Sequence, residues 1–541
     1  MKLLKKIDSL FPDEGDVPLE FDFKTPINQT EYLVNGKLHQ WDGPVQQVLS
    51  PVCVRTSSGL SQKIIGSHPL LTEKEALMVI DAASDAYGNG MGSWPSMHVE
   101  ERIEHLEEFT RQMKERKSEV VNLLMWEIGK SYPDSVSEFD RTVDYIHDTI
   151  DALKSMDRDS SGFLIKDGII GQIRRAPRGV VLCMGPSNYP LNETFTTAIP
   201  ALVMGNTVVL KLPRPGSLIF YPLLEAFCKS FPEGVVNTIY GEGRKIISPL
   251  ISSGKIDSLA YIGTSKVANA LKRQHPKLNR LHCSFGLDAK NAAIVLKDAD
   301  LELTIKECIT GALSYNGQRC TALKILFVHS KIVDPFIKQL AEAISKLEIG
   351  MPWEKDVYIT PMPDPQKIEY LTELVNDAKA HGAEVINEAG GTQNETFFYP
   401  ALLYPVNHDM RLYREEQFGP VIPVISFDDI EEPVQYIVES NYGLQASIFG
   451  KDTHVIANLI DSLVNQVARV NINSQCQRGP DSFPFTGRKD SAEGTLSISD
   501  ALRAFSVESI VAAKETDANR AIIKKIVREN KSTFLSTDFI L

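Results

Sequence analysis

Apolar residues recur at helical spacing in the first part of the chain. Residues 72–75 (TEKE) have the spacing of a capping box, and Leu77, Ile80 and Ala83 then follow three residues apart. A second stretch places four apolar residues on one helical face, with charged residues between them: Ile103, Leu106, Phe109 and Met113. We therefore predict two amphipathic helices here, each packed by its apolar face against another part of the protein.

From residue 179 the pattern changes to short apolar runs that are separated by segments of helix length. The runs occupy residues 179–184, 207–212, 235–240 and 258–262. Strands that lack polar alternation are usually buried on both faces, as in a parallel sheet covered by helices. This alternation predicts a doubly wound α/β domain, and a nucleotide site is plausible at the carboxyl ends of its strands.

Two further apolar runs, residues 291–296 and 323–329, predict a second α/β unit. No low-complexity linker or internal repeat separates the two units, so we expect them to pack tightly. The last stretch, residues 515–541, is polar and charged around Ile522, Ile523 and Ile526, which is typical of a terminal helix or arm.

The chain has 541 residues, of which 43% are hydrophobic and 23% charged, and its formal net charge is −13. This length is sufficient for two or three domains. The negative charge repels nucleic acids and anionic lipid surfaces. The basic start, residues 1–6 (MKLLKK), meets acidic residues too early for a signal peptide, and no apolar run reaches membrane-spanning length. We expect no nucleic-acid or membrane partner.

The seven cysteines are odd in number and scattered, without a Cys-x-x-Cys pair, a pattern that suits the reducing cytoplasm. The eleven histidines are equally scattered and form no His-Glu-x-x-His motif. The sequence therefore shows no set of metal ligands, and we predict no metal.

One cysteine, Cys320, has neighbours that indicate chemistry. A free cysteine is usually an inert small hydrophobe. Cys320, however, lies in residues 317–321 (GQRCT), where a turn-forming glycine and the adjacent cation Arg319 are expected to expose the sulfur and favour the thiolate. Cys320 is our candidate nucleophile.

Several motifs in the same order resemble the aldehyde dehydrogenase superfamily, from about residue 25 to about residue 510. Within it, the chain is most similar to the non-phosphorylating, NADP-dependent glyceraldehyde-3-phosphate dehydrogenases. The motifs that carry this resemblance are residues 185–190 (GPSNYP), 317–321 (GQRCT), 415–420 (EEQFGP) and 473–485 (NSQCQRGPDSFPF).

The resemblance implies an α/β fold with a discontinuous Rossmann-like cofactor domain, an α/β catalytic domain and a β oligomerisation arm. It also implies a cytoplasmic homodimer or homotetramer. The expected boundaries are residues 20–155 and 176–288 for the cofactor domain, 289–489 for the catalytic domain, and 156–175 and 490–541 for the arm and C-terminal extension.

The resemblance also implies how the reaction begins. Cys320 attacks the aldehyde, and the amide of Asn188 stabilises the oxyanion that forms on the carbonyl oxygen. Losing one oxyanion donor typically costs ~3 kcal/mol. Without Cys320, an asparagine that closes a strand-end turn would be the simpler interpretation of Asn188.

Cofactor contacts follow from the same resemblance. Lys211 matches the lysine that holds the adenosine ribose. Arg214 stands where NAD-preferring relatives commonly carry an acidic residue, so we expect it to attract the 2′-phosphate of NADP; a solvated surface arginine is the alternative. The other expected cofactor contacts are Gly263 and Thr264 at the pyrophosphate, and Glu416 and Phe418 at the nicotinamide ribose.

Four positions match the substrate-phosphate pocket of the same relatives: Arg141, Tyr189, Arg319 and Arg478. Three converging guanidinium groups suit a phosphate dianion, although a helical arginine such as Arg141 is more often a surface ion-pair residue. The resemblance thus implies oxidation of a phosphorylated aldehyde, with glyceraldehyde 3-phosphate converted to 3-phosphoglycerate through a cysteine thioester.

Residues 285–291 (FGLDAKN) depart from the family pattern, because Gly286 stands where the family has the glutamate that activates water. Without that general base the thioester on Cys320 is expected to accumulate, unless the nearby Asp288 has taken the role. Two alternatives stay open. The acceptor is a thiol such as coenzyme A, or the chain is a hydrolysis-impaired or non-catalytic NADP-binding homologue.

Overall fold

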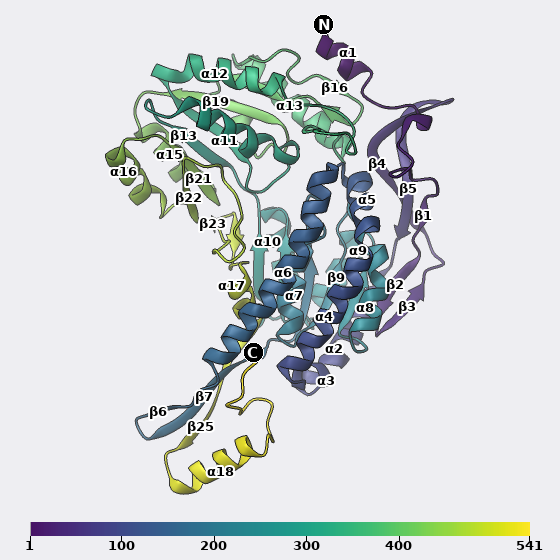
Figure 1. Cartoon of the computed structure of the whole chain (residues 1–541), viewed down its shortest axis with the longest axis vertical. Coiled ribbons are helices and arrows are strands. Elements are labelled where there is room, and N and C mark those ends of the chain that lie inside the picture. Colours follow the sequence, from purple (N-terminus) through teal and green to yellow (C-terminus); the bar gives the residue numbers. More distant parts are fainter. Residues whose placement is uncertain (1, 541) are drawn as a thin grey trace.

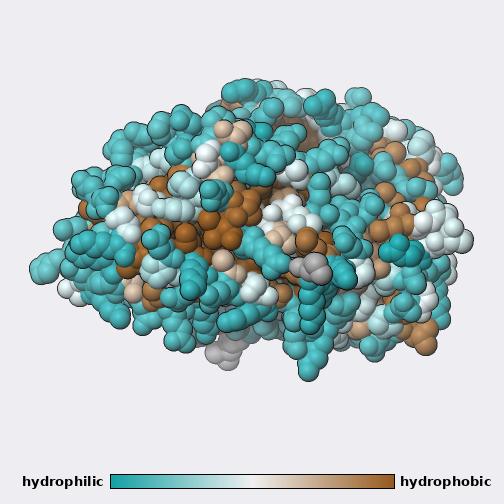
Figure 2. Space-filling model, turned by 90° about the horizontal axis from the view of Figure 1, so that it is seen from above, coloured by the Kyte–Doolittle hydropathy of each residue, from teal (hydrophilic) through white to brown (hydrophobic). Residues whose placement is uncertain are grey.

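The computed structural model describes residues 2–540. Met1, where the basic N-terminal segment begins, and Leu541, where the predicted C-terminal extension ends, lie outside the described residues. Figure 1 shows two lobes, each built around one sheet, and an arm that extends away from both. Seen from above, the outer surface is mainly hydrophilic, with apolar side chains gathered across the middle of that face (Figure 2).

The first lobe contains the predicted parallel sheet. Its strands lie in the order β10-β9-β8-β11-β12-β24, and every neighbouring pair is parallel except the edge strand β24. The strands are β8 (Val180–Met184), β9 (Thr207–Lys211), β10 (Val236–Ile239), β11 (Ser258–Ile262), β12 (His282–Gly286) and β24 (Ala492–Glu493). The four apolar runs thus form strands as predicted. β24, however, joins this sheet from a segment that we had assigned to the C-terminal extension.

Helices connect and cover the strands of this sheet. Four helices follow successive strands: α7 (Asn192–Val203), α8 (Leu224–Ser230), α9 (Gly243–Ser252) and α10 (Ser265–Gln274). Four more come from earlier in the chain: α2 (Glu73–Tyr87), α3 (Ser93–Ser96), α4 (Val99–Glu115) and α5 (Lys117–Ile128). The two predicted amphipathic helices are α2 and α4, and the capping box of Thr72 and Glu75 is formed. Leu77 is an exception, because it remains 38% exposed while Val79 and Ile80 face the core.

The second lobe is also an α/β unit. Its sheet has the order β15-β18-β19-β14-β13-β21-β22, with only β15 antiparallel to its neighbour. The strands are β13 (Asn291–Val295), β14 (Leu323–His329), β15 (Glu384–Val385), β18 (Ala401–Tyr404), β19 (Val421–Phe427), β21 (Gln445–Phe449) and β22 (Arg469–Ile472).

Alternate residues of the strands in this second sheet face two different layers of helices. Leu326 of β14 packs in one apolar cluster with α11 (Leu301–Leu313) and α12 (Ser330–Ser345), whereas Phe327 packs in another with α15 (Glu431–Glu439) and α16 (Thr453–Leu463). The sheet is therefore covered on both faces, which explains why its strands lack polar alternation. Helices α13 (Pro365–Ala380) and α14 (Arg411–Arg414) complete the lobe.

The N-terminal region forms strands that the sequence patterns did not predict. Strands β1 (Ile27–Asn28), β4 (Val45–Thr56) and β5 (Gly59–Pro69) make a small sheet, and β2 (Glu31–Val34) pairs with β3 (Lys37–Gln40). The short helix α1 (Lys2–Asp8) packs on the second lobe, where the Asn394 side chain donates to the carbonyl of Ile7 over 2.7 Å.

The arm is a three-stranded sheet of β6 (Leu164–Lys166), β7 (Ile169–Pro177) and β25 (Ser506–Lys514). The arm begins later than the predicted residue 156, because helix α6 (Tyr132–Asp159) ends only at Asp159 and the first strand of the arm starts at Leu164. The terminal helix α18 (Asp517–Arg528) follows β25. No helix among residues 2–540 is long and apolar enough to cross a membrane.

Candidate active site

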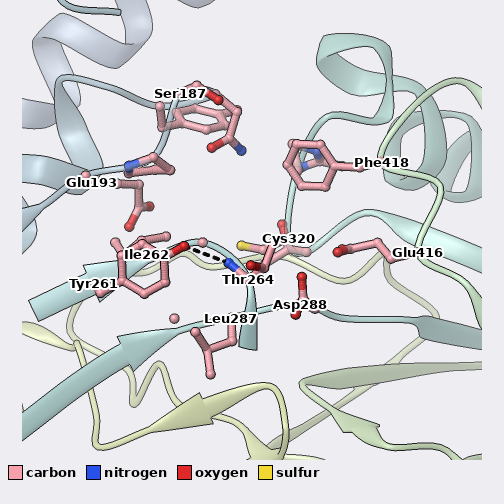
Figure 3. Close-up of a pocket in the computed structure, with 18 of the residues that line it drawn as sticks. Ser187, Glu193, Tyr261, Ile262, Thr264, Leu287, Asp288, Cys320, Glu416 and Phe418 are labelled. Atoms are coloured by element: carbon pink, nitrogen blue, oxygen red, sulfur yellow. Dashed lines mark hydrogen bonds between the residues drawn. The ribbon is translucent and has the colours of Figure 1, made fainter. Parts of the chain in front are cut away.

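A cavity of about 1070 Å³ lies where the carboxyl ends of the first sheet face the second lobe. Every residue predicted for the site lines it: Asn188, Cys320, Lys211, Arg214, Gly263, Thr264, Glu416, Phe418, Arg141, Tyr189, Arg319 and Arg478. Figure 3 shows that Cys320 lies in the middle of this cavity, with Glu193 on one side and Glu416 on the other. The structure thus brings together residues that are far apart in the sequence.

Cys320 is presented by a tight turn that precedes β14. Gly317 has a φ of 70°, and a Cβ atom there would approach the carbonyl oxygens of Ala312 and Gly419 at 2.6 and 2.8 Å. Only glycine fits this position without displacing the backbone. The carbonyl of Cys320 accepts a hydrogen bond from Asn291 Nδ2 over 2.8 Å, which fixes the turn from the neighbouring strand.

The pKa of the Cys320 thiol is raised to about 11, first by burial and then by the carboxylate of Glu193. Lys324 and Arg478 act in the opposite direction but do not overcome these effects. The prediction that Arg319 favours the thiolate is therefore wrong, because its guanidinium donates to the backbone carbonyls of Thr310 and Gly311. Deprotonation of Cys320 needs a base or the charge of bound ligands.

Asn188 lies beside the nucleophile. Its Nδ2 donates to the carbonyl of Gln318 over 2.7 Å, which leaves the second amide hydrogen for another acceptor. Lys130 Nζ donates to the carbonyl of Asn188 over 3.0 Å and pairs with Glu138 in a completely buried ion pair. Glu138 also accepts the backbone N–H of Leu191 over 3.1 Å, so the pair fixes the segment that leads into α7.

Two cations stand together at the far end of the cavity. Lys211 ends β9, and Arg214 is an exposed residue of the following loop. Burial and the nearby Arg214 lower the pKa of Lys211 to about 8. Among residues 2–540, no carboxylate forms an ion pair with either side chain. This end of the cavity therefore carries uncompensated positive charge, which suits an anionic ligand.

The start of α10 forms the adjacent wall. The backbone N–H of Thr264 donates to Tyr261 Oη over 3.1 Å (Figure 3), and Thr264 caps the helix. Asp288 Oδ2 accepts the N–H of Ser265 over 2.7 Å. Asp288 is thus held at this helix terminus, where it occupies one of the N–H groups that an anion would use.

Glu416 and Phe418 approach Cys320 from the second lobe. Glu416 forms an ion pair with Lys324 and accepts the N–H of Ala289 over 3.2 Å. The Nζ of Lys324 also lies 5.3 Å from the centre of the Phe418 ring. These contacts hold both side chains at the wall of the cavity.

Two of the three arginines near Cys320 form ion pairs. Arg141 donates two hydrogen bonds to Asp481, over 2.9 and 2.7 Å. Arg478 contacts Asp481 over 3.2 Å and forms a closer ion pair with Glu193. Arg319 has no carboxylate partner within residues 2–540, and it donates to the carbonyls of Thr310 and Gly311 over 2.9 and 3.0 Å. Tyr189 lies beneath Lys130, whose Nζ is 3.5 Å from the ring centre.

The sequence reasoning missed the two carboxylates in this cluster. Asp481 lies within the motif at residues 473–485, three residues after Arg478, so the sequence already contained this possible partner for Arg478. Glu193 could have been noticed as an acidic residue that directly precedes the buried run 194–203. A charge at the start of such a buried segment needs a partner or a function.

Gly286 ends β12 beside Cys320, and its carbonyl accepts the N–H of Gly263 over 3.0 Å. A Cβ atom at this position would meet its nearest neighbours, two atoms of Ile262, at 3.6 and 3.7 Å, which is ordinary contact. Its φ lies outside the left-handed region. Neither space nor backbone conformation therefore requires glycine here.

Within residues 2–540, no group of three or more histidine, cysteine, aspartate or glutamate side chains is arranged to hold a metal ion.

Comparison with known proteins agrees with this geometry. The chain is 33% identical to an NADP-dependent glyceraldehyde-3-phosphate dehydrogenase of Pisum sativum over 87% of its length and 94% of the relative. It is 32% identical to an enzyme of the same name from Streptococcus equinus, over 84% and 92% of the two chains.

A solved structure from Bacillus halodurans C-125, an NADP-dependent glyceraldehyde-3-phosphate dehydrogenase complexed with NADP, superposes with a TM-score of 0.82 at 32% identity. It covers 90% of this chain and 100% of its own. The aldehyde dehydrogenase family matches residues 52–511, which include both sheets and the whole cavity. The predicted fold class is confirmed, and the chain belongs to the aldehyde dehydrogenase family.

Proposed function

We propose that this protein oxidises a phosphorylated aldehyde with NADP, with glyceraldehyde 3-phosphate as the lead substrate and 3-phosphoglycerate as the product. One observation carries the proposal. A single cavity holds the nucleophile Cys320 between an arginine cluster at one end and the unpaired Lys211 and Arg214 at the other. The names of the most similar relatives support the same assignment.

The cofactor end fits NADP in its charge. Lys211 and Arg214 repel each other without a carboxylate between them, and a 2′-phosphate would neutralise both. Gly263, Thr264, Glu416 and Phe418 line the route from these cations to Cys320. Asp288 fits less well, because its carboxylate already uses an N–H group at the start of α10. When bound, NADP supplies the acceptor for the hydride that leaves the substrate.

The chain itself supplies the nucleophile and the oxyanion site. Cys320 loses its proton and its sulfur attacks the aldehyde carbon. The free amide hydrogen of Asn188 and the backbone N–H of Cys320 then donate to the developing oxyanion, a contribution of about 3 kcal/mol for one such donor. Collapse of the oxyanion as hydride departs leaves a thioester on Cys320.

The arginine cluster supports a substrate phosphate, although it is partly neutralised. Its guanidinium groups belong to Arg141, Arg319 and Arg478, and its carboxylates to Glu193 and Asp481. Three cations face two anions, so one positive charge remains, and Arg319 is the group without an ion-pair partner. A phosphate would contact Arg319 directly and compete with Glu193 for Arg478.

A second candidate function follows from Gly286. Without the family's glutamate at this position, the acyl group could pass to a thiol such as coenzyme A instead of water. Rapid NADPH formation that requires added coenzyme A would support that acylating reaction.

We further propose a cytoplasmic homodimer or homotetramer. The seven described cysteines are all free, as expected in a reducing compartment. Apolar side chains on the arm remain exposed, including Leu164 at 63% and Ile510 at 60%, which supports association through this sheet. Sedimentation analysis of the full chain would give the number of subunits.

NADPH formation by the purified protein tests the main proposal. Glyceraldehyde 3-phosphate should give a larger kcat/KM than unphosphorylated glyceraldehyde, and Arg478→Ala should raise KM more for the phosphate ester than for glyceraldehyde. Equal kcat/KM for the two aldehydes, or no effect of Arg478→Ala, would remove the phosphate pocket from the proposal. Parallel reactions with coenzyme A, inorganic phosphate or neither separate the two candidate functions.

A further inference from the structure

A second, smaller cavity of about 20 Å³ adjoins the sulfur of Cys320. Gly286 forms part of its wall, and Glu193 provides its only carboxylate among the described residues. The rest of the lining is mainly apolar, with Ile262 and Leu496 nearby. A space of 10–15 Å³ is roughly sufficient for one water molecule, so this cavity can hold one beside the nucleophile.

Glu193 reaches this cavity from the first turn of α7, which starts at Asn192. Its Oε2 is bound by Arg478, whereas no residue within 2–540 donates a hydrogen bond to its Oε1. The side chain is 13% exposed. In Figure 3 Glu193 and Glu416 lie on opposite sides of Cys320. Glu193 therefore combines a fixed position with a free acceptor oxygen.

The carboxylate of Glu193 also acts on the nucleophile electrostatically. After burial, it is the main cause that raises the pKa of Cys320, ahead of the other carboxylate, Glu416. This effect is consistent with the placement of both side chains in the wall of the small cavity.

The other carboxylates around the large cavity are engaged elsewhere. Asp288 accepts the N–H of Ser265 at the start of α10. Glu416 is paired with Lys324. Glu415 accepts hydrogen bonds from Arg411 over 2.9 and 3.0 Å. None of these three lines the small cavity beside Cys320 and Gly286.

We propose that Glu193 is the general base that activates water for hydrolysis of the Cys320 thioester, in place of the carboxylate that Gly286 lacks. This inference rests on the proposed function, because it concerns the second half of that reaction. It assigns water as the acceptor and makes a thiol acceptor unnecessary. Accumulation of the thioester, which the sequence alone led us to expect, then depends on Glu193.

The proposed step is balanced in atoms and charge. Water in the small cavity gives a proton to Oε1 of Glu193 while its oxygen attacks the thioester carbon. The bond from that carbon to Sγ of Cys320 then breaks, and the electron pair leaves on the sulfur. The carboxylic acid product ionises, and the proton on Glu193 passes to solvent or to Cys320. No oxidant or reductant takes part in this half-reaction.

Arg478 holds the carboxylate of Glu193 in place through their ion pair. The same guanidinium is also a contact expected for the substrate phosphate. A phosphate in the acylated enzyme would share Arg478 and loosen its hold on Glu193. The rate of hydrolysis should therefore differ between a phosphorylated acyl group and an unphosphorylated one of the same length.

The test follows deacylation of Cys320 directly. Glu193→Gln should turn steady NADPH formation from glyceraldehyde 3-phosphate into a burst of about one NADPH per site. Loss of a general base typically slows a step 10²- to 10⁴-fold, so intact mass should show the acyl adduct persisting. The matched control is Glu225→Gln on the exposed surface of α8, which should behave as the wild type.

Two further variants separate catalysis from structure. Glu193→Asp keeps a charge for Arg478 but withdraws the carboxylate from the small cavity, and it should also slow deacylation. The double variant Glu193→Gln/Gly286→Glu introduces a carboxylate at another position in the wall of the small cavity, where a Cβ atom makes only ordinary contacts, and should recover much of the lost rate. A rate-versus-pH profile of deacylation should lose its acid limb in Glu193→Gln and regain one in the double variant.

Acylation by p-nitrophenyl acetate makes this test independent of the cofactor and of the substrate phosphate. The ester acetylates Cys320 directly, and release of acetate reports hydrolysis alone. Absence of NADPH with normal ester hydrolysis would count against the proposed function but not against Glu193. Acetyl-Cys320 that is hydrolysed by Glu193→Gln and Glu193→Asp within twofold of the wild-type rate would overturn the assignment of Glu193.

Discussion

Reversing the charge of Arg214 should reverse the cofactor preference. In the structure, Arg214 lies near Lys211 without a carboxylate partner, so its contact with a 2′-phosphate would be an unopposed charge-assisted hydrogen bond. Such contacts contribute about 1.5–3 kcal/mol. Each 1.4 kcal/mol corresponds to a tenfold change in affinity, so loss of the contact should weaken NADP binding roughly 10- to 150-fold. Because Arg214 is exposed, solvent screening favours the lower end of this range.

Arg214→Gln and Arg214→Glu distinguish loss of attraction from added repulsion. Arg214→Gln should weaken NADP binding and leave NAD binding almost unchanged. Arg214→Glu should in addition strengthen NAD binding, because the ribose hydroxyls of NAD can donate to the new carboxylate. Calorimetric titration of both cofactors into each variant gives the four dissociation constants. An equal loss of affinity for NADP and NAD would mean that Arg214 stabilises the loop and does not bind the 2′-phosphate. Equal binding of both cofactors by the wild type would remove the assignment altogether.

Three other predictions follow from the same structure. Burial and Arg214 lower the pKa of Lys211 to about 8, so NADP affinity should fall as the pH rises through 8, and NAD affinity should fall less because NAD lacks the 2′-phosphate. Asp288→Asn keeps an acceptor for Ser265 but removes a negative charge from the start of α10, so the dissociation constant of NADP should decrease several-fold; an increase would contradict this. Lys130→Met leaves Glu138 buried without its partner, and urea unfolding should show a loss of about 3–5 kcal/mol, with a smaller loss in a double variant that also neutralises Glu138.

The parts of the fold that were predicted are those with a local pattern. The buried runs that became β8, β9, β10 and β11 are uninterrupted and β-branched, and the capping box at Thr72 marks the start of α2. The N-terminal strands were missed because pairing between β4 and β5 depends on a long hairpin with irregular register rather than on simple alternation. The domain boundaries stay a prediction, and β24 shows that the chain returns to the first sheet after leaving it.

The residues of the candidate site that could be predicted are those that lie in contiguous sequence motifs. Cys320, Asn188 and Glu416 each lie in such a segment, and the cavity contains all of them. The ion pair between Glu193 and Arg478 joins positions 285 residues apart, so no local pattern contains both. The raised pKa of Cys320 could not be predicted from the sequence either. It depends on the direction of the Arg319 side chain, which the position of Arg319 next to Cys320 in the chain does not reveal.

The space around Gly286 determines how easily this site can be redesigned. A glycine that is required by a left-handed φ or by a close backbone contact cannot be replaced without displacing the backbone. Position 286 has neither restriction, and its nearest neighbours are side-chain carbons of Ile262 and Leu496. A carboxylate can therefore be introduced there by a single substitution, and its effect on turnover should depend on whether Glu193 is also present.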